Sequence, residues 1–165
     1  AGSRRVIDLH GRVDRVSCMD CGLKLPRGPL QNWLEANNPG YARLSGAIAP
    51  DGDADLDQLD YSQLAVPDCE HCGGVLKPDA VFYGDSVPKE TVASAQQQLQ
   101  QAEGLLVVGS SLMVYSGYRF CRWAEQQGKP IVLLNQGVTR ADDLATVKDQ
   151  SSCGIVLSSW LDSEA

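Results

Sequence analysis

The sequence predicts an α/β protein whose second half is a parallel sheet with helices between its strands. Two aliphatic runs, Leu105–Val108 and Ile131–Leu134, show no polar alternation, which is typical of strands buried on both faces of a sheet. Helical patterns precede and separate these runs, and strands that alternate with helices indicate parallel pairing. Two C-x-x-C pairs in the first half predict a small metal-stabilised module.

The first half is predicted to contain one strand, one short helix and one extended segment. Apolar and charged residues alternate over 13–16, which indicates a brief strand. A helix is expected over 29–36, because it begins with a proline and stops at an Asn-Asn-Pro-Gly turn. The acidic stretch 40–63 has little periodicity and is interpreted as a long surface insertion. Residues 75–84 are expected to be mostly extended.

The second half continues the alternation of helices and strands. Apolar residues spaced three and four apart predict a helix over 88–102, with Ser86 available as its N-cap. A second helix is expected over 118–127, where a Gly-Lys-Pro turn ends it, and a short one over 141–147. Residues 155–157 are predicted to form the last short strand.

Composition and charge exclude several classes of protein. The 165 residues are 43% hydrophobic and 21% charged, so a wholly disordered chain is excluded. The 14 basic and 21 acidic side chains give a net charge of -7, which argues against a nucleic-acid partner. No apolar run is long enough to cross a bilayer, and the first residues resemble no signal peptide. We therefore expect a soluble protein with no membrane partner, located in the cytoplasm, or in the mitochondrial matrix of a eukaryote.

The two C-x-x-C pairs, Cys18 with Cys21 and Cys69 with Cys72, are the strongest chemical signal in the sequence. Each pair can bind one Zn²⁺ through two thiolates, and two pairs complete a tetrahedral site. Four protein ligands leave no open position, so the expected ion is structural, with one per chain. Redox-active thiols and unpaired core cysteines are the alternatives. His71, which lies between two better ligands, is interpreted as a spacer.

Two strand ends predict a nucleotide-binding crevice. Gly109, Ser110 and Ser111 follow the first aliphatic run, at the carboxyl end where α/β folds bind ligands. Asn135 ends the next run in the same way and is a candidate partner of a ribose or a base. Ordinary tight turns are the alternative for both positions. The sequence contains no G-x-G, so it has strand ends typical of ligand binding without the dinucleotide fingerprint.

Taken in order, these motifs resemble the sirtuins, which are NAD-dependent protein lysine deacylases. The resemblance is carried by Leu-His-Gly at 9–11, the two C-x-x-C pairs, the run over 77–85, Val-Gly-Ser-Ser-Leu over 108–112, and Leu134-Asn135. Residues 109–120 and 139–144, with the long insertion, are most similar to class II sirtuins, the branch of the fourth mammalian sirtuin. The resemblance implies the C-terminal part of a Rossmann-like NAD domain with an inserted zinc-binding module.

The resemblance also implies a role for each matched residue. His10, which from its spacing alone is more often structural than catalytic, matches the general base that helps a ribose hydroxyl to react after nicotinamide has left. The paired cysteines match the structural zinc ligands. The residues that match NAD contacts are Gly109, Ser110, Ser111, Asn135, Gln136, Gly137 and Cys153. The substrate peptide is expected to add as a strand between two segments, made of Val81, Phe82, Tyr83 and Gly84 and of Val114 and Tyr115.

A division of the chain follows from the same resemblance. Residues 1–12 are expected to form a connector that carries the histidine motif. Residues 13–80 are expected to form the zinc module with its insertion, and residues 81–165 the C-terminal part of the NAD domain. Sirtuins carry a Gly-Ala-Gly phosphate loop, an Asn-Ile-Asp-like loop and a Thr-Gln-Asn segment before Leu-His-Gly, and this sequence contains none of them. We therefore expect this chain alone to bind NAD weakly, to be nearly inactive, and to self-associate through the face that such a segment covers.

The predicted function of the complete protein is NAD-dependent deacylation of acyl-lysine in proteins or peptides, with nicotinamide and O-acyl-ADP-ribose as products. ADP-ribosyl transfer is a variant, because another nucleophile can capture the same ribose carbon. A non-catalytic zinc-stabilised domain that binds proteins, or a nucleotide weakly, is the alternative class. A zinc-ribbon protein unrelated to NAD is a third hypothesis. Titration with NAD of this chain and of a longer form discriminates the first two hypotheses.

Overall fold

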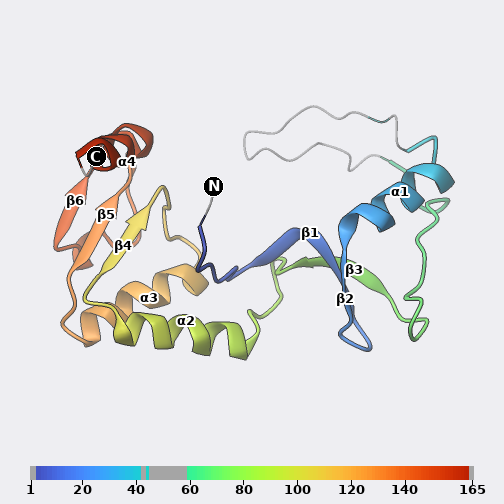
Figure 1. Ribbon diagram of the computed structural model, residues 1–165, viewed down its shortest axis with the longest axis horizontal. Coiled ribbons are helices and arrows are strands. Elements are labelled where there is room, and N and C mark those ends of the chain that lie inside the picture. Colours follow the sequence, from blue (N-terminus) through green and yellow to red (C-terminus); the bar gives the residue numbers. More distant parts are fainter. Residues whose placement is uncertain (1–2, 42–43, 45–58, 164–165) are drawn as a thin grey trace. The chain divides into compact units, whose positions relative to one another are not determined.

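A computed structural model of the chain describes residues 3–41, 44 and 59–163, so most of the insertion predicted over 40–63 lies outside the described residues. The chain divides into two units, one of His10–Asp85 and the other of Ala1–Leu9 with Ser86–Ala165 (Figure 1). No helix in the described part of the chain combines the length and the hydropathy that a membrane span needs.

The unit His10–Asp85 is built on a three-stranded antiparallel sheet. The central strand β1 pairs with β2 on one side and with β3 on the other. The strand predicted over 13–16 is confirmed and is longer than expected, and the helix predicted over 29–36 begins at Arg27. The elements of this unit are β1 (Gly11–Cys18), β2 (Lys24–Pro26), α1 (Arg27–Asn37) and β3 (Leu76–Ala80).

The second unit contains the predicted parallel sheet, with strand order β4-β5-β6. Its first two strands have the predicted bounds, Leu105–Val108 and Ile131–Leu134. Helices α2 and α3 run side by side against this sheet (Figure 1), and α3 buries Tyr118, Cys121 and Ala124. The elements are α2 (Lys89–Gln101), β4 (Leu105–Val108), α3 (Tyr115–Gln126), β5 (Ile131–Leu134), the 3-10 helix η1 (Asp142–Leu144), β6 (Val147–Asp149) and α4 (Cys153–Ser163).

The last part of the chain differs from the prediction. The helix predicted over 141–147 is a single 3-10 turn, and Val147–Asp149 forms the third strand instead. The strand predicted over 155–157 lies within the helix α4. Short apolar runs do not distinguish a strand from a helix, and here the pairing of β6 along β5 overrides the local pattern.

Both long helices begin differently from the prediction. Pro88, and not Ser86, is the N-cap of α2, and no side chain caps this helix by a hydrogen bond. Helix α3 begins at Tyr115, because the N–H groups of Gly117 and Tyr118 already donate to the carbonyl of Val114. A serine and a glycine in this first turn hide the helical periodicity from the sequence.

The prediction that the strands are buried on both faces holds for β5 and fails for β4. In β5, Ile131, Leu133 and Leu134 are buried. In β4, which is an edge strand among the described residues, Leu106 is 46% exposed and Val108 is 37% exposed. One face of this edge strand therefore presents aliphatic side chains to solvent.

A lysine closes the C-terminus of α2. Lys129, in the turn between α3 and β5, donates hydrogen bonds from Nζ to the carbonyls of Leu99 (2.6 Å), Gln100 (2.7 Å) and Ala102 (2.7 Å). The last carbonyls of a helix have no partners within the helix, and a cation there also complements the helix dipole. Lys129 therefore ties α2 to the start of β5.

We expect the substitution Lys129→Met to lower the free energy of unfolding by about 2 kcal/mol, because three charge-assisted bonds are lost while the aliphatic stem is kept. Urea unfolding followed by circular dichroism measures this loss. Lys89→Met is the matched control, since Lys89 is exposed in the first turn of the same helix, where a cation opposes the dipole. Equal losses in the two variants would contradict the capping role.

Candidate metal centre and nucleotide-binding edge

The four paired cysteines meet at one place in the unit His10–Asp85. Their sulfur atoms all lie within 4.8 Å of one another. The Sγ atoms of Cys18 and Cys72 are 3.5 Å apart, and those of Cys21 and Cys69 are 3.9 Å apart. In a tetrahedral site with metal–sulfur bonds of about 2.3 Å, sulfur atoms are about 3.8 Å apart. The cluster therefore has the dimensions of a four-thiolate metal site.

Two tight turns of the backbone build this cluster. Gly22 and Gly73 both have φ of 73°, in the left-handed region that favours glycine. The N–H of Gly22 donates to the carbonyl of Cys18 (3.1 Å), and the N–H of Gly73 donates to that of Cys69 (2.7 Å). Each turn thus brings the second cysteine of its pair next to the first, as the spacing predicts.

Crowding of the thiols opposes their joint ionisation. The N–H groups of Cys21 and Asp20, directed at the Cys18 sulfur, lower the pKa of Cys18 to about 7. The Gly74 N–H favours the thiolate of Cys72, but the neighbouring sulfurs of Cys18 and Cys21 outweigh it, and the pKa of Cys72 rises to about 12. Four thiolates at these distances need a cation among them, and thiolate ligands favour a soft metal such as zinc.

In the second unit, three of the residues that match NAD contacts lie together at the carboxyl edge of the parallel sheet. The N–H of Gly109 donates to the carbonyl of Leu134 (2.9 Å), which continues the pairing of β4 with β5. The Sγ of Cys153 donates to the same carbonyl (3.3 Å). A Cβ atom placed on Gly109 would lie 3.9 Å from this sulfur. Asn135 follows directly, and its N–H donates to Asp149 at the end of β6 (3.0 Å).

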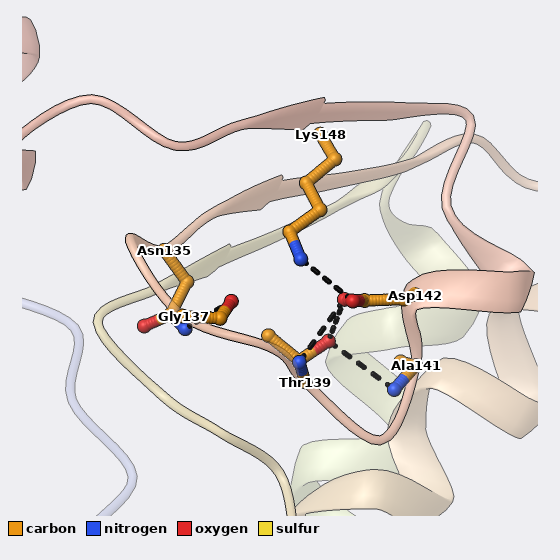
Figure 2. A network of polar contacts seen from close by, with 6 residues as sticks. All are labelled: Asn135, Gly137, Thr139, Ala141, Asp142 and Lys148. Atoms are coloured by element: carbon orange, nitrogen blue, oxygen red, sulfur yellow. Dashed lines mark hydrogen bonds and ion pairs between the residues drawn. The ribbon is translucent and has the colours of Figure 1, made fainter.

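The loop after β5 is held by an aspartate that sequence reasoning missed (Figure 2). Thr139 donates to Oδ1 of Asp142 from both its N–H (3.1 Å) and its hydroxyl (2.6 Å), and Lys148 donates to Oδ2 (2.6 Å). These bonds hold the pKa of Asp142 below its usual range, and the bond from Lys148 has the largest effect. The Asn135 side chain donates to the carbonyl of Gly137 (3.1 Å). The Thr-x-x-Asp spacing is the one signal in the sequence that could have indicated this network.

His10 lies at the start of β1, in the unit His10–Asp85. Its carbonyl accepts the N–H of Val81 (2.9 Å), so the histidine is fixed beside the first of the predicted peptide-binding residues. Gly11, with φ of 79°, follows it. A Cβ on Gly11 would lie 2.0 Å from the carbonyl oxygen of Asp79, so only glycine allows β1 to approach β3 here.

The two predicted peptide-binding segments are both exposed and belong to different units. Phe82 is 52% exposed and Tyr83 is 98% exposed, next to the end of β3. Val114 is 50% exposed and Tyr115 is 57% exposed, at the start of α3. Exposed aromatic and aliphatic side chains of this kind are suited to contact a partner.

Comparison with known proteins identifies the family to which this chain belongs. The model of the Sir2 family matches residues 1–116, and the chain belongs to that family. This confirms the resemblance to the sirtuins and the partial sirtuin fold, with its parallel sheet and four-cysteine cluster.

Individual relatives agree with this assignment. The chain is 54% identical to "NAD-dependent protein deacetylase 2" of Bradyrhizobium diazoefficiens, an alignment that covers 95% of this chain and 58% of that one. It is 48% identical to the bovine "NAD-dependent protein lipoamidase sirtuin-4, mitochondrial", with 95% and 50% covered. The solved structure "Sir2-p53 peptide-NAD+" superimposes with a TM-score of 0.74 at 26% identity, over 99% of this chain and 57% of that one. The chain thus spans between 50% and 58% of the length of these relatives.

Proposed function

We propose that this chain belongs to an NAD-dependent protein lysine deacylase that releases nicotinamide and O-acyl-ADP-ribose. The observation that carries the proposal is the 54% identity to a named NAD-dependent deacetylase over 95% of the chain. The solved relatives named as bound to NAD and to acetylated peptide support the same two substrates.

Cys18, Cys21, Cys69 and Cys72 would hold one Zn²⁺, which when bound cross-links the two turns and leaves no position open for substrate. The sulfur–sulfur distances of 3.5 and 3.9 Å fit this ion without a large movement of the turns. The role we assign to the four thiols is therefore structural, and the chemistry of the reaction falls to other residues.

The carboxyl edge of the parallel sheet is the proposed NAD subsite. Gly109, Ser110 and Ser111 are assigned to phosphate and ribose; the Gly109 N–H is used by the sheet, so this residue would contribute through the close approach that a glycine backbone allows. Residues 135–137 are assigned to the adenosine ribose, and Cys153 to the side of the adenine. Their position at the ends of β4 and β5 is where α/β folds bind nucleotides, which supports this assignment.

His10 is the proposed general base. In this mechanism the acyl oxygen of the substrate lysine displaces nicotinamide at the ribose, and His10 then accepts the proton of a ribose hydroxyl that attacks the captured acyl group. The peptide would pair as an added strand between residues 81–84 and Val114 with Tyr115. If another nucleophile captures the same ribose carbon, the outcome is ADP-ribosyl transfer.

The proposal is tested by nicotinamide release from the full-length natural protein and from this chain, each with NAD and an acetyl-lysine peptide. We expect turnover and O-acetyl-ADP-ribose from the full-length protein only. Positioning of the reacting groups supplies about 7–11 kcal/mol in such reactions, and this chain corresponds to only 58% of a relative's length. Robust turnover by the 165 residues alone would contradict the proposed dependence on a further segment.

The other outcomes identify the alternatives. ADP-ribose attached covalently to protein indicates the transfer reaction, and absence of NAD binding in the full-length protein favours a non-catalytic domain.

Light scattering belongs in the same experiment, because we also propose that this chain alone self-associates. Leu106 and Val108 on β4 are exposed, and an apolar groove of about 340 Å³ in the same unit is lined among others by Leu99, Leu105 and Phe120.

A further inference from the structure

The segment between β4 and α3 contains a leucine in an unfavourable backbone conformation. Leu112 has φ of 57°, in the left-handed region where a side chain crowds the backbone. Its side chain is only 8% exposed, and a Cβ atom placed on Gly117 in α3 would lie 3.6 Å from its Cδ2. Such a conformation persists where the surrounding structure holds it in place, and it is found most often in binding and catalytic sites.

One residue from another loop holds both sides of this leucine, once through its backbone and once through its side chain. The N–H of Arg140 donates to the carbonyl of Ser111 (2.9 Å), directly before Leu112. The guanidinium Nη1 of the same arginine donates to the carbonyl of Met113 (3.0 Å), directly after it. The backbone on either side of Leu112 is therefore fixed by a single residue.

Arg140 is itself fixed in position. Its guanidinium carbon lies 4.5 Å from the centre of the Tyr118 ring and 5.8 Å from that of Tyr115, so the cation is within cation–π distance of both rings. The residues on either side of Arg140 belong to the turn that Asp142 holds through Thr139. The arginine thus connects a rigid turn after β5 to the segment that follows β4.

We infer that Arg140 is a positioning residue that orients the NAD subsite and the peptide subsite together. Ser110 and Ser111 precede Leu112, and Val114 and Tyr115 follow it, so the backbone rotation at Leu112 sets both groups at once. This inference rests on the proposed function for the roles of those residues. The bond to the Met113 carbonyl and the contact with the rings need a planar guanidinium, which a lysine ammonium does not reproduce, whereas the backbone bond to Ser111 does not depend on the side chain.

The first test uses this chain and does not depend on its activity. In Arg140→Met we expect the backbone amides of residues 111–115 to exchange with deuterium roughly tenfold faster, because the guanidinium contacts no longer oppose local opening of this segment. Arg27→Met is the matched control, since Arg27 belongs to the other unit and its guanidinium bonds Gln31 instead. Unchanged exchange in the Arg140 variant overturns the inference. If Arg140→Met does not fold, Arg140→Lys is measured in its place against the same criterion.

The second test uses the full-length natural protein. We expect Arg140→Lys to raise KM for NAD and KM for the acyl-lysine peptide together, each by roughly tenfold, with a smaller change in kcat. Arg27→Lys is expected to change neither KM. A rise in only one KM, or a fall in kcat alone, overturns the inference that Arg140 orients both subsites. If the full-length protein has no deacylase activity, the proposed function fails, whereas the exchange measurement still decides whether Arg140 holds the segment.

Discussion

Replacement of Cys21 by serine is expected to abolish metal binding and to unfold most of the unit His10–Asp85. The buried apolar side chains described in this unit are few, namely Val16 and the ligands Cys18 and Cys69. Structural zinc sites in small domains contribute about 10–16 kcal/mol of apparent binding free energy, which matches or exceeds the stability of a typical domain. Loss of one thiolate therefore removes the largest stabilising interaction available to this unit.

Bound zinc per chain, measured by plasma mass spectrometry, should fall from about one equivalent to nearly none. Hydrogen exchange over 11–37 should approach the unfolded rate, while β4 and β5 stay protected because they belong to the other unit. The control is Cys153→Ser, which keeps a donor for the Leu134 carbonyl and lies outside the cluster. A Cys21→Ser protein with one equivalent of zinc and an unchanged melting temperature would refute the assignment.

Elements with a strong local pattern could be predicted from the sequence, and elements that depend on a neighbouring strand could not. Residues 105–108 and 131–134 are uninterrupted aliphatic runs between helices, and their strands have the predicted bounds. Residues 147–149, Val-Lys-Asp, carry no such pattern and become a strand only by pairing with β5. Residues 155–157, Ile-Val-Leu, are more aliphatic than residues 147–149. They nevertheless lie in the helix α4, because they pair with none of the described strands.

The same distinction applies to the candidate site. The cysteine cluster could be predicted because ligand spacing is encoded within each C-x-x-C turn. The contact of Arg140 with Met113 and that of Lys129 with the end of α2 join residues that are distant in the sequence. An arginine or a lysine does not indicate by its residue type which distant carbonyl it will bind. Gly11 is a further example, since its need for glycine arises from the Asp79 carbonyl on another strand.

Replacement of His10 by alanine in the full-length protein is expected to lower kcat/KM for deacylation by about 10²–10⁴-fold, the usual contribution of a general base. The fold should be retained, because the interaction of this residue with Val81 uses its backbone carbonyl, which alanine keeps. His71→Ala is the matched control, since His71 is the other histidine of the chain and is exposed in the second cysteine turn. We expect this variant to keep its deacylase activity.

The order of steps in the proposed mechanism sharpens this test. His10 acts after nicotinamide has left, so His10→Ala should still exchange labelled nicotinamide into NAD in the presence of an acyl-lysine peptide, although it forms little product. Zinc content and melting temperature, measured on the same samples, show whether the substitution has disturbed the fold. Near-normal product formation by His10→Ala would remove the histidine from the mechanism. Loss of exchange together with product formation, in a folded protein, would instead place its role at or before the departure of nicotinamide.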